Sequence, residues 1–229
     1  MNIIEIILNA LKLIISADPT LFEVIYLSLR VSSTALLIAS TIGIIIGYLL
    51  ALKNFYLKNT LLIIINSLMG VPPVVVGLIV YFFFAHGGPL GALKLLYTPF
   101  AMIIAQIIII FPIVTSLSHE IFFQKWLQYK DEFRSLNISF FGTLKIIIIH
   151  SYFLLIVVLL SAFGRAISEV GAVMIVGGNI DHYTRVMTTA ISLETRKGNL
   201  EYAMALGIIL ILLTMFIYSL VYIFNLRKR

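Results

Sequence analysis

A series of apolar runs, each long enough to cross a lipid bilayer, constrains the fold of this chain more than any other feature. The five longest lie at about residues 21–52, 59–85, 98–123, 146–177 and 201–226. A transmembrane helix needs about 20 apolar residues to cross the ~30 Å hydrocarbon core. A soluble domain of 229 residues could not bury a chain that is 61% hydrophobic and only 11% charged. The sequence therefore predicts an all-α integral membrane protein, with residues 19–229 forming one domain of about five transmembrane helices.

The first 18 residues form a shorter, amphipathic segment. Its polar residues recur at spacings of three and four along an otherwise apolar helix, and they are Asn2, Glu5, Asn9, Lys12 and Ser16. About 16 residues make only ~24 Å of helix, which is too short to span the membrane comfortably. The Asp18-Pro19 pair then ends the segment. We expect residues 1–18 to be an interfacial helix lying on the membrane, with a sixth span as the alternative.

The distribution of Lys and Arg predicts the orientation of the spans, because cytoplasmic loops carry an excess of positive charge. The favoured topology places nine basic residues inside: Lys53, Lys58, Lys125, Lys130, Arg134, Lys145, Arg227, Lys228 and Arg229. Five fall outside: Lys12, Lys94, Arg185, Arg196 and Lys197. We therefore expect a multi-pass protein of the cell (inner) membrane with its N-terminus outside and its C-terminus in the cytoplasm.

The charged segment at about residues 124–146 is the one predicted cytoplasmic loop large enough to carry structure of its own. Within it, residues 129–136 can form a short helix whose apolar edge consists of Phe133, Leu136 and Phe140. Asn137 is suited to the left-handed stop of that helix, and Ser139 can cap the next one. We expect a short helix held across the ends of the spans, offering an apolar knob to a cytoplasmic partner. An ordinary amphipathic loop packed on its own protein is the alternative.

Two stretches of the chain resemble known transporter motifs. Residues 131–139, Asp-Glu-Phe-Arg-Ser-Leu-Asn-Ile-Ser, resemble the EAA loop of ABC importer permeases, with Asp131 in place of Glu, Asn137 in place of Gly and Ile149-His150 in place of Leu-Pro. Residues 164–179 are similar to the R-A-x-x-E-x-G-A segment of molybdate, sulfate and tungstate permeases, and look most like the tungstate branch. Residues 70–77 and 184–191 agree with this resemblance.

The resemblance implies a type I ABC importer permease fold and a channel subunit for a tetrahedral oxyanion, most like tungstate, with molybdate or sulfate as alternatives. It also implies a homodimer, two cytoplasmic ATPase subunits and an external oxyanion-binding protein. ATP and Mg²⁺ would be bound by the separate ATPase, since this chain has no G-x-x-x-x-G-K-[ST] loop. The residues expected to couple the chain to the ATPase are Asp131, Glu132, Phe133, Arg134, Leu136, Asn137, Ile138 and Ser139.

Three charged residues fall within the predicted spans, where charges are expensive and usually face a bundle interior or a water-filled cavity. Arg165 and Glu169 are one helical turn apart and can pair. Arg30 lies at a similar depth in the first span, if the fourth span continues to Gly177. We hypothesise that Arg30 and Glu169 approach each other with Arg165 nearby, which would leave a net positive charge on the path of a dianion. A purely structural ion pair is the alternative.

The second span carries Pro72 and Pro73 in its middle, where each removes a backbone donor and disturbs the helix. Gly70 and Gly77 on either side permit close helix approach. A gate-lining role is our hypothesis for this break, and a structural kink is the alternative. The full set of predicted pathway and gate residues is Arg30, Pro72, Pro73, Arg165, Ser168, Glu169 and Gly171.

Other classes of function find less support in the sequence. There are no cysteines and the four histidines are dispersed, so no metal site or resident cofactor is expected. The scattered basic residues form no face for nucleic acid, and no nucleophile–base constellation suggests an enzyme. A secondary transporter or channel without an ATPase remains the alternative class. Such proteins often have paired discontinuous helices, whereas only the second span carries a Pro-Pro break.

Overall fold

The computed structural model describes residues 3–226, and within that range the chain is built of helices. In chain order these are α1 Ile3–Ile15, α2 Pro19–Leu52, α3 Lys58–Leu68, α4 Pro73–Phe84, the 3-10 turn η1 Gly91–Leu93, α5 Pro99–Ser135, α6 Phe140–Ile167, α7 Gly171–Gly177, α8 Met187–Lys197 and α9 Leu200–Leu226. Four residues named in the sequence analysis lie outside the described residues: Asn2, Arg227, Lys228 and Arg229.

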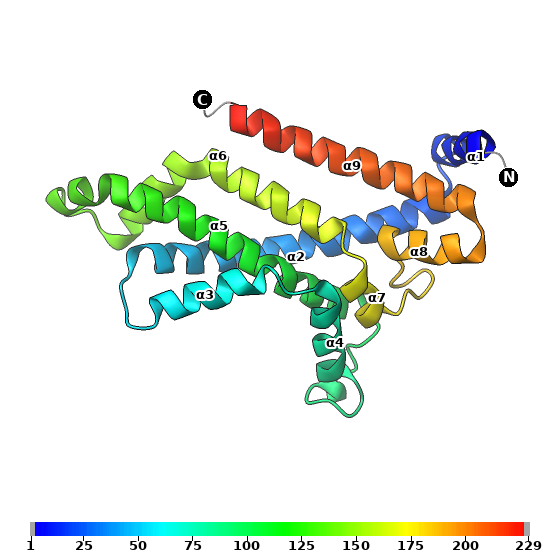
Figure 1. Ribbon diagram of the computed structural model, residues 1–229, viewed down its shortest axis with the longest axis horizontal. Helices are drawn as coiled ribbons and strands as arrows, with labels where there is room; N and C mark the ends of the chain where they lie inside the picture. Colours follow the sequence, from blue (N-terminus) through cyan, green and yellow to red (C-terminus); the bar gives the residue numbers. More distant parts are fainter. Residues whose placement is uncertain (1–2, 227–229) are drawn as a thin grey trace.

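Four helices are long and apolar enough to cross a membrane: α2, α5, α6 and α9. In Figure 1 they run alongside one another, with the α2–α3 and α5–α6 links at one end and α8 at the other. The pair α3 and α4 passes the same test together but is bent by 102°. The structure therefore has four spans, or five if the bent pair counts as one, in agreement with the sequence prediction.

The closest packing in the bundle is a seam of small residues between α2 and α5. Ala35, Ala39, Gly43 and Gly47 recur every four residues, so they share one face of α2, and all of them are buried. A Cβ added at Gly47 would lie 2.9 Å from the backbone oxygen of Thr115, closer than side chains normally pack. Small residues let membrane helices approach until their backbones touch, which replaces the hydrophobic driving force that lipid does not supply.

The predicted break in the second span is confirmed. Helix α3 ends at Leu68 and α4 begins at Pro73, so Pro72 and Pro73 stand at the start of a new helix, where a missing N–H costs nothing. Figure 1 shows α4 leaving the bundle and pointing away from the long helices. The two prolines therefore redirect the chain by about a right angle, as the 102° bend measures.

The fourth span is broken as well, which contradicts the expected continuous helix over residues 146–177. Helix α6 ends at Ile167, and α7 begins at Gly171. Side chains satisfy the backbone around the gap: Ser168 Oγ donates to the Gly164 oxygen at 2.8 Å, and Glu169 Oε1 accepts from the Ala172 N–H at 3.2 Å. Ser and acidic side chains that bond the nearby backbone compete with helix continuation in this way.

The cytoplasmic-side helix also differs from its prediction. Helix α5 continues without interruption from Pro99 to Ser135, so residues 129–135 extend a span and are not a separate helix lying across the span ends. The physical reason is that no Gly or Pro occurs between Pro112 and the end of α5 to break it. The stop and the cap are confirmed: Asn137 has φ +49°, and Ser139 Oγ accepts from the Gly142 N–H at 3.2 Å.

Helix α1 packs against the start of α9, and Figure 1 shows it nearly end-on beside the first turns of that helix. Ile6 and Ala10 are buried, and Asn9 Nδ2 donates to Glu201 Oε1 at 2.8 Å. The helix is followed by Asp18, whose carboxylate accepts from the Thr20 N–H at 2.9 Å and caps α2. The predicted place of residues 1–18 on the membrane surface stays a prediction.

Candidate translocation site and coupling surface

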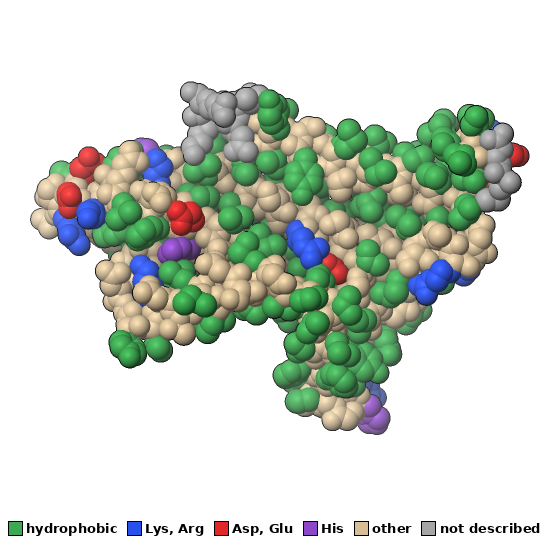
Figure 2. All heavy atoms as spheres, in the orientation of Figure 1, with side chains coloured by type: hydrophobic (Ala, Val, Ile, Leu, Met, Phe, Trp, Pro, Cys, Tyr) green, Lys and Arg blue, Asp and Glu red, His purple; other side chains and the backbone are tan. Residues whose placement is uncertain are grey.

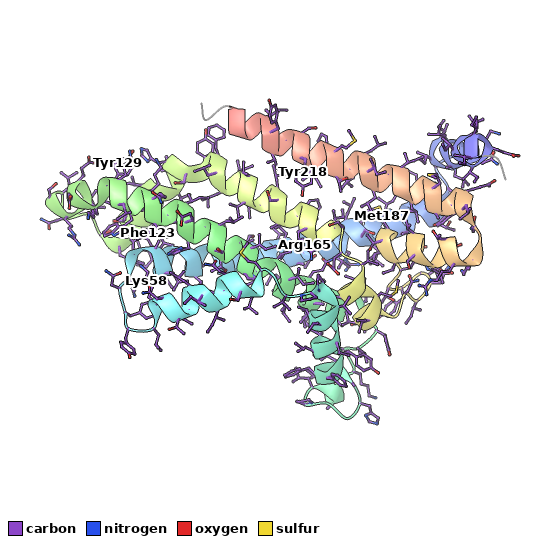
Figure 3. All side chains as sticks on the ribbon, viewed as in Figure 1. Lys58, Phe123, Tyr129, Arg165, Met187 and Tyr218 are labelled. Atoms are coloured by element: carbon purple, nitrogen blue, oxygen red, sulfur yellow. The ribbon has the colours of Figure 1, made fainter. Side chains whose placement is uncertain are left out.

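An ion pair lies in the middle of the bundle, where the sequence predicted it. Arg165 Nη1 donates to Glu169 Oε2 at 3.0 Å, with the Glu169 side chain 4% exposed and that of Arg165 39% exposed. Figure 3 labels Arg165 midway along the molecule, and Figure 2 shows a cationic and an acidic side chain in contact at that place. The guanidinium is therefore held by a buried carboxylate while part of it faces the surface.

Glu169 holds three elements together at the break between α6 and α7. One carboxylate oxygen accepts from Arg165 and the other from the Ala172 N–H. Its backbone oxygen accepts from the Thr188 hydroxyl of α8 at 2.7 Å. Buried charges are tolerated only when they are paired and hydrogen-bonded, and both oxygens of this carboxylate are. Glu169 is thus an anchor that orients Arg165, and it has no oxygen left for another cation to claim.

The two broken spans pack against each other through small residues. A Cβ added at Gly77 of α4 would lie 2.6 Å from the Cα of Ala172 on α7. A Cβ added at Gly171 would lie 2.5 Å from Cγ2 of Val74. Neither position can therefore carry a side chain without moving one helix from the other. The predicted gate residues Pro72, Pro73, Ser168 and Gly171 accordingly lie at two breaks that meet.

A buried glutamine that the sequence analysis missed supports the same place. Gln106 of α5 is 4% exposed, and its Nε2 donates to the Ala166 oxygen at 3.0 Å, next to the end of α6. Its Oε1 is buried and has no hydrogen-bond partner in the part of the chain that the structure describes. The signal that could have found it is a lone amide within the apolar run at 98–123, since polar side chains inside a span mark interhelical contacts.

Arg30 is not brought together with Glu169. The described residues contain no ion pair between them, and Arg30 instead lines an outer cavity with Glu23 and Asp181. The estimate of similar depth assumed that the fourth helix continues to Gly177. Because the helix ends at Ile167 and Glu169 is already satisfied on both oxygens, that assumption fails and the carboxylate is not available to Arg30.

The predicted coupling residues surround the turn between α5 and α6. Phe133 is 6% exposed and packs against Trp126 and Tyr129, so it belongs to the interior and does not form an outward knob as expected. Leu136, in contrast, is 71% exposed at the turn. The remaining predicted residues at this turn are exposed or half-buried, namely Asp131, Glu132, Arg134, Asn137, Ile138 and Ser139. Phe141, which was not singled out, is 78% exposed beside them.

Parallel membrane-length helices, two discontinuous spans in contact and a paired charge at the breaks define a multi-pass membrane protein of the transporter class. The chain belongs to the family of binding-protein-dependent transport system inner membrane components, whose pattern matches residues 41–229. Membership confirms the predicted type I ABC importer permease fold.

Individual relatives are similar over nearly the whole chain. The tungstate uptake system permease protein TupB of Peptoclostridium acidaminophilum is 39% identical over 213 residues, which cover 93% of each protein. TupB of Campylobacter jejuni is 37% identical, over 90% of this chain and 86% of that one. The sulfate transport system permease protein CysW of Escherichia coli is 27% identical, over 89% of this chain and 74% of that one. The tungstate-like character of residues 164–179 is thus matched by whole-chain similarity.

Proposed function

We propose that this chain is the membrane-spanning permease subunit of an ATP-driven importer that carries tungstate into the cell. The observation that carries the proposal is the 39% identity to a tungstate uptake permease across 93% of both chains. The sulfate permease is more distant at 27% identity. Molybdate and sulfate are the competing substrates, because all three are tetrahedral oxyanions of the same charge.

The proposed assembly contains two copies of this chain, two ATPase subunits in the cytoplasm and an oxyanion-binding protein outside. Helix α4 supports the pairing of two copies, since it projects from the bundle with apolar side chains on its surface (Figure 2), including Val74, Val75, Leu78, Ile79, Phe82 and Phe83. The family description, which refers to dependence on a binding protein, supports the external partner.

The proposed orientation has the N-terminus outside and the C-terminus in the cytoplasm. The excess of Lys and Arg on the predicted inner loops supports it. The arrangement of the helices is compatible with it, since the α2–α3 link and the α5–α6 turn lie at one end of the bundle in Figure 1. Under this orientation the exposed Leu136 and Phe141 face the cytoplasm, where the ATPase would bind.

Coupling in this proposal runs along α5. The helix has 37 residues and links the turn at Leu136 with Gln106, which holds the end of α6. Closure of the ATPase pair would move the two α5–α6 turns together, and an unbroken helix would carry that motion to the meeting of the two broken spans. Alternating access requires two packings of similar energy, each favoured by a different ligand state.

Arg165 is the proposed pathway residue at this meeting point. Its guanidinium is 39% exposed and held by Glu169, so it can attract an anion without leaving a buried charge unpaired. Tetrahedral oxyanions suit the planar fork of a guanidinium. The pair as a whole is neutral, which favours passage over retention of a dianion.

The experiment that tests the substrate is competition in the complete transporter, reconstituted with its ATPase and binding protein. Tungstate should stimulate ATP hydrolysis at the lowest concentration, molybdate at a higher one and sulfate least. Stimulation by sulfate at lower concentrations than by either heavier oxyanion would overturn the substrate assignment. Tungstate accumulation that persists without any ATPase would instead favour a secondary transporter.

A further inference from the structure

A cavity of about 550 Å³ lies between the first turns of α2, the loop from Gly178 to Val186, α8 and the start of α9. It is contained within one chain. In Figure 1 the helices that form it gather at the end of the bundle opposite the α5–α6 turn, which is the outer end in the proposed orientation. Its lining is rich in charged and phenolic side chains, although the protein around it is mostly apolar.

Each carboxylate in the lining already has a cationic partner. The three pairs are Glu23 with His182 at 2.7 Å, Asp181 with Arg185 at 2.6 Å, and Glu194 with Lys197 at 2.9 Å. These pairs join α2 to the loop, close the loop on itself and tie the end of α8. Because the acidic groups are neutralised locally, they do not set up a field that repels an incoming anion.

Two donors in the lining remain unused. Arg30 is exposed, and within the described chain it is the only basic residue of this cavity that has no acidic partner. The Nε–H of Arg185 is buried and also has no partner among the described residues. With His182 protonated, four cationic groups face three carboxylates, which leaves one net positive charge. The hydrogen bond to Glu23, followed by the charges of Glu23 and Asp181, raises the pKa of His182 above its ordinary value and favours that state, with Arg185 opposing.

We propose that this cavity is an acceptor site for a free tetrahedral oxyanion on the outer side of the permease, with Arg30 as its principal ligand. The proposal rests on the proposed function for the identity of the anion, tungstate. A guanidinium makes two parallel hydrogen bonds to such an anion. The site would hold a dianion weakly, because its net charge is smaller than that of its ligand, and a weak site suits a station from which the anion must move on.

The absence of cysteine from the chain allows a direct test on the full-length permease purified in lipid-free detergent. A single cysteine replaces Tyr183, which lines the cavity and is 48% exposed. A matched control is Leu90→Cys, a loop position with 40% exposure outside the cavity. The rates of modification by anionic and cationic thiol reagents of similar size are compared, with and without tungstate.

We expect the anionic reagent to react several-fold faster than the cationic one at Tyr183→Cys, and tungstate to slow that reaction several-fold. Neither effect should occur at Leu90→Cys. Adding Arg30→Gln should abolish both effects, Arg30→Lys should restore part of them, and Lys12→Gln, which changes a basic residue away from the cavity, should leave them intact. Acetate at equal ionic strength should not protect.

Equal rates for the two reagents, protection that survives Arg30→Gln, or equal protection by acetate would each overturn the proposal. Protection by phosphatidylglycerol micelles but not by tungstate would assign the cavity to a lipid headgroup and overturn it as well. The assay needs neither ATPase nor binding protein. Failure of tungstate uptake in the complete transporter would therefore reject the proposed function while leaving the result at this cavity separately readable.

Discussion

The two ends of the bundle are built in different ways. Toward the α5–α6 turn the helices are continuous, and an interior of aromatic side chains fixes them, with Phe122, Phe133 and Tyr48 almost completely buried. Toward the other end two spans are broken, and side chains such as Glu169 and Thr188 replace the missing backbone bonds. A rigid half can transmit a displacement, whereas a half held by individual polar contacts can exchange one packing for another. Four substitutions or conditions test this division, from the largest expected effect on stability to the smallest.

The largest effect is expected from Glu169→Ala. The change removes the partner of Arg165 and the acceptor for the Ala172 N–H, so a charge and a backbone donor lose their partners at once. Breaking a buried pair costs ~3–5 kcal/mol, and the partial exposure of Arg165 argues for the lower end. Thermal unfolding in detergent measures the loss. An unchanged unfolding temperature would show that this end is not held by Glu169.

Gly77→Ala should destabilise the contact between the broken spans by ~1–3 kcal/mol, as overpacking does elsewhere. The added Cβ would lie 2.6 Å from the Cα of Ala172, so α4 and α7 must separate. Uptake should fall together with the unfolding temperature. Gly207→Ala is the matched control, because a Cβ there meets no atom within 4 Å, and it should be neutral or slightly stabilising. Equal behaviour of the two variants would contradict the close packing of α4 on α7.

Leu136→Asp should change the stability of the spans by no more than ~0.5 kcal/mol, since the side chain is 71% exposed. It should nevertheless detach the ATPase or uncouple hydrolysis from uptake, because a charge replaces the apolar contact at the turn. Co-purification of the ATPase and the ratio of tungstate transported to ATP hydrolysed measure both outcomes. Normal transport by this variant would show that Leu136 does not dock the ATPase.

The smallest effect is expected from pH. The pKa of His182 is raised above 6.5 by its hydrogen bond to Glu23, so the contact stabilises the outer loop fully below pH 6.5 and is lost as pH rises through the raised value. Hydrogen exchange of residues 180–185 should therefore quicken across that interval. His182→Gln should remove the pH dependence, and a loop that exchanges equally fast on both sides of the interval in the parent chain would contradict the contact.

Features set by local chemistry were predictable from the sequence. Apolar run length indicated the spans, two prolines indicated the bend before α4, and Asn137 and Ser139 marked the stop and the cap between α5 and α6. The spacing of four between Arg165 and Glu169 indicated their pair. Each of these depends on a few adjacent residues, which is why no tertiary information was needed.

Features set by tertiary contacts were missed. The break between α6 and α7 has no proline, and it depends on bonds made by Ser168 and Glu169, partly to α8. The position of Arg30 was misjudged as a consequence. This second break also removes an argument used against a secondary transporter, since paired discontinuous helices are present after all. Family membership now distinguishes the classes where helix counting does not.

The most direct test of the account is the accumulation of labelled tungstate by vesicles that contain this chain, its ATPase and its binding protein. The binding protein is supplied outside and ATP inside, and matched vesicles lack either ATP or the ATPase. The account predicts accumulation against a gradient only when all components are present. Equal accumulation without ATP or ATPase, or none in the complete system while sulfate is accumulated, would contradict it.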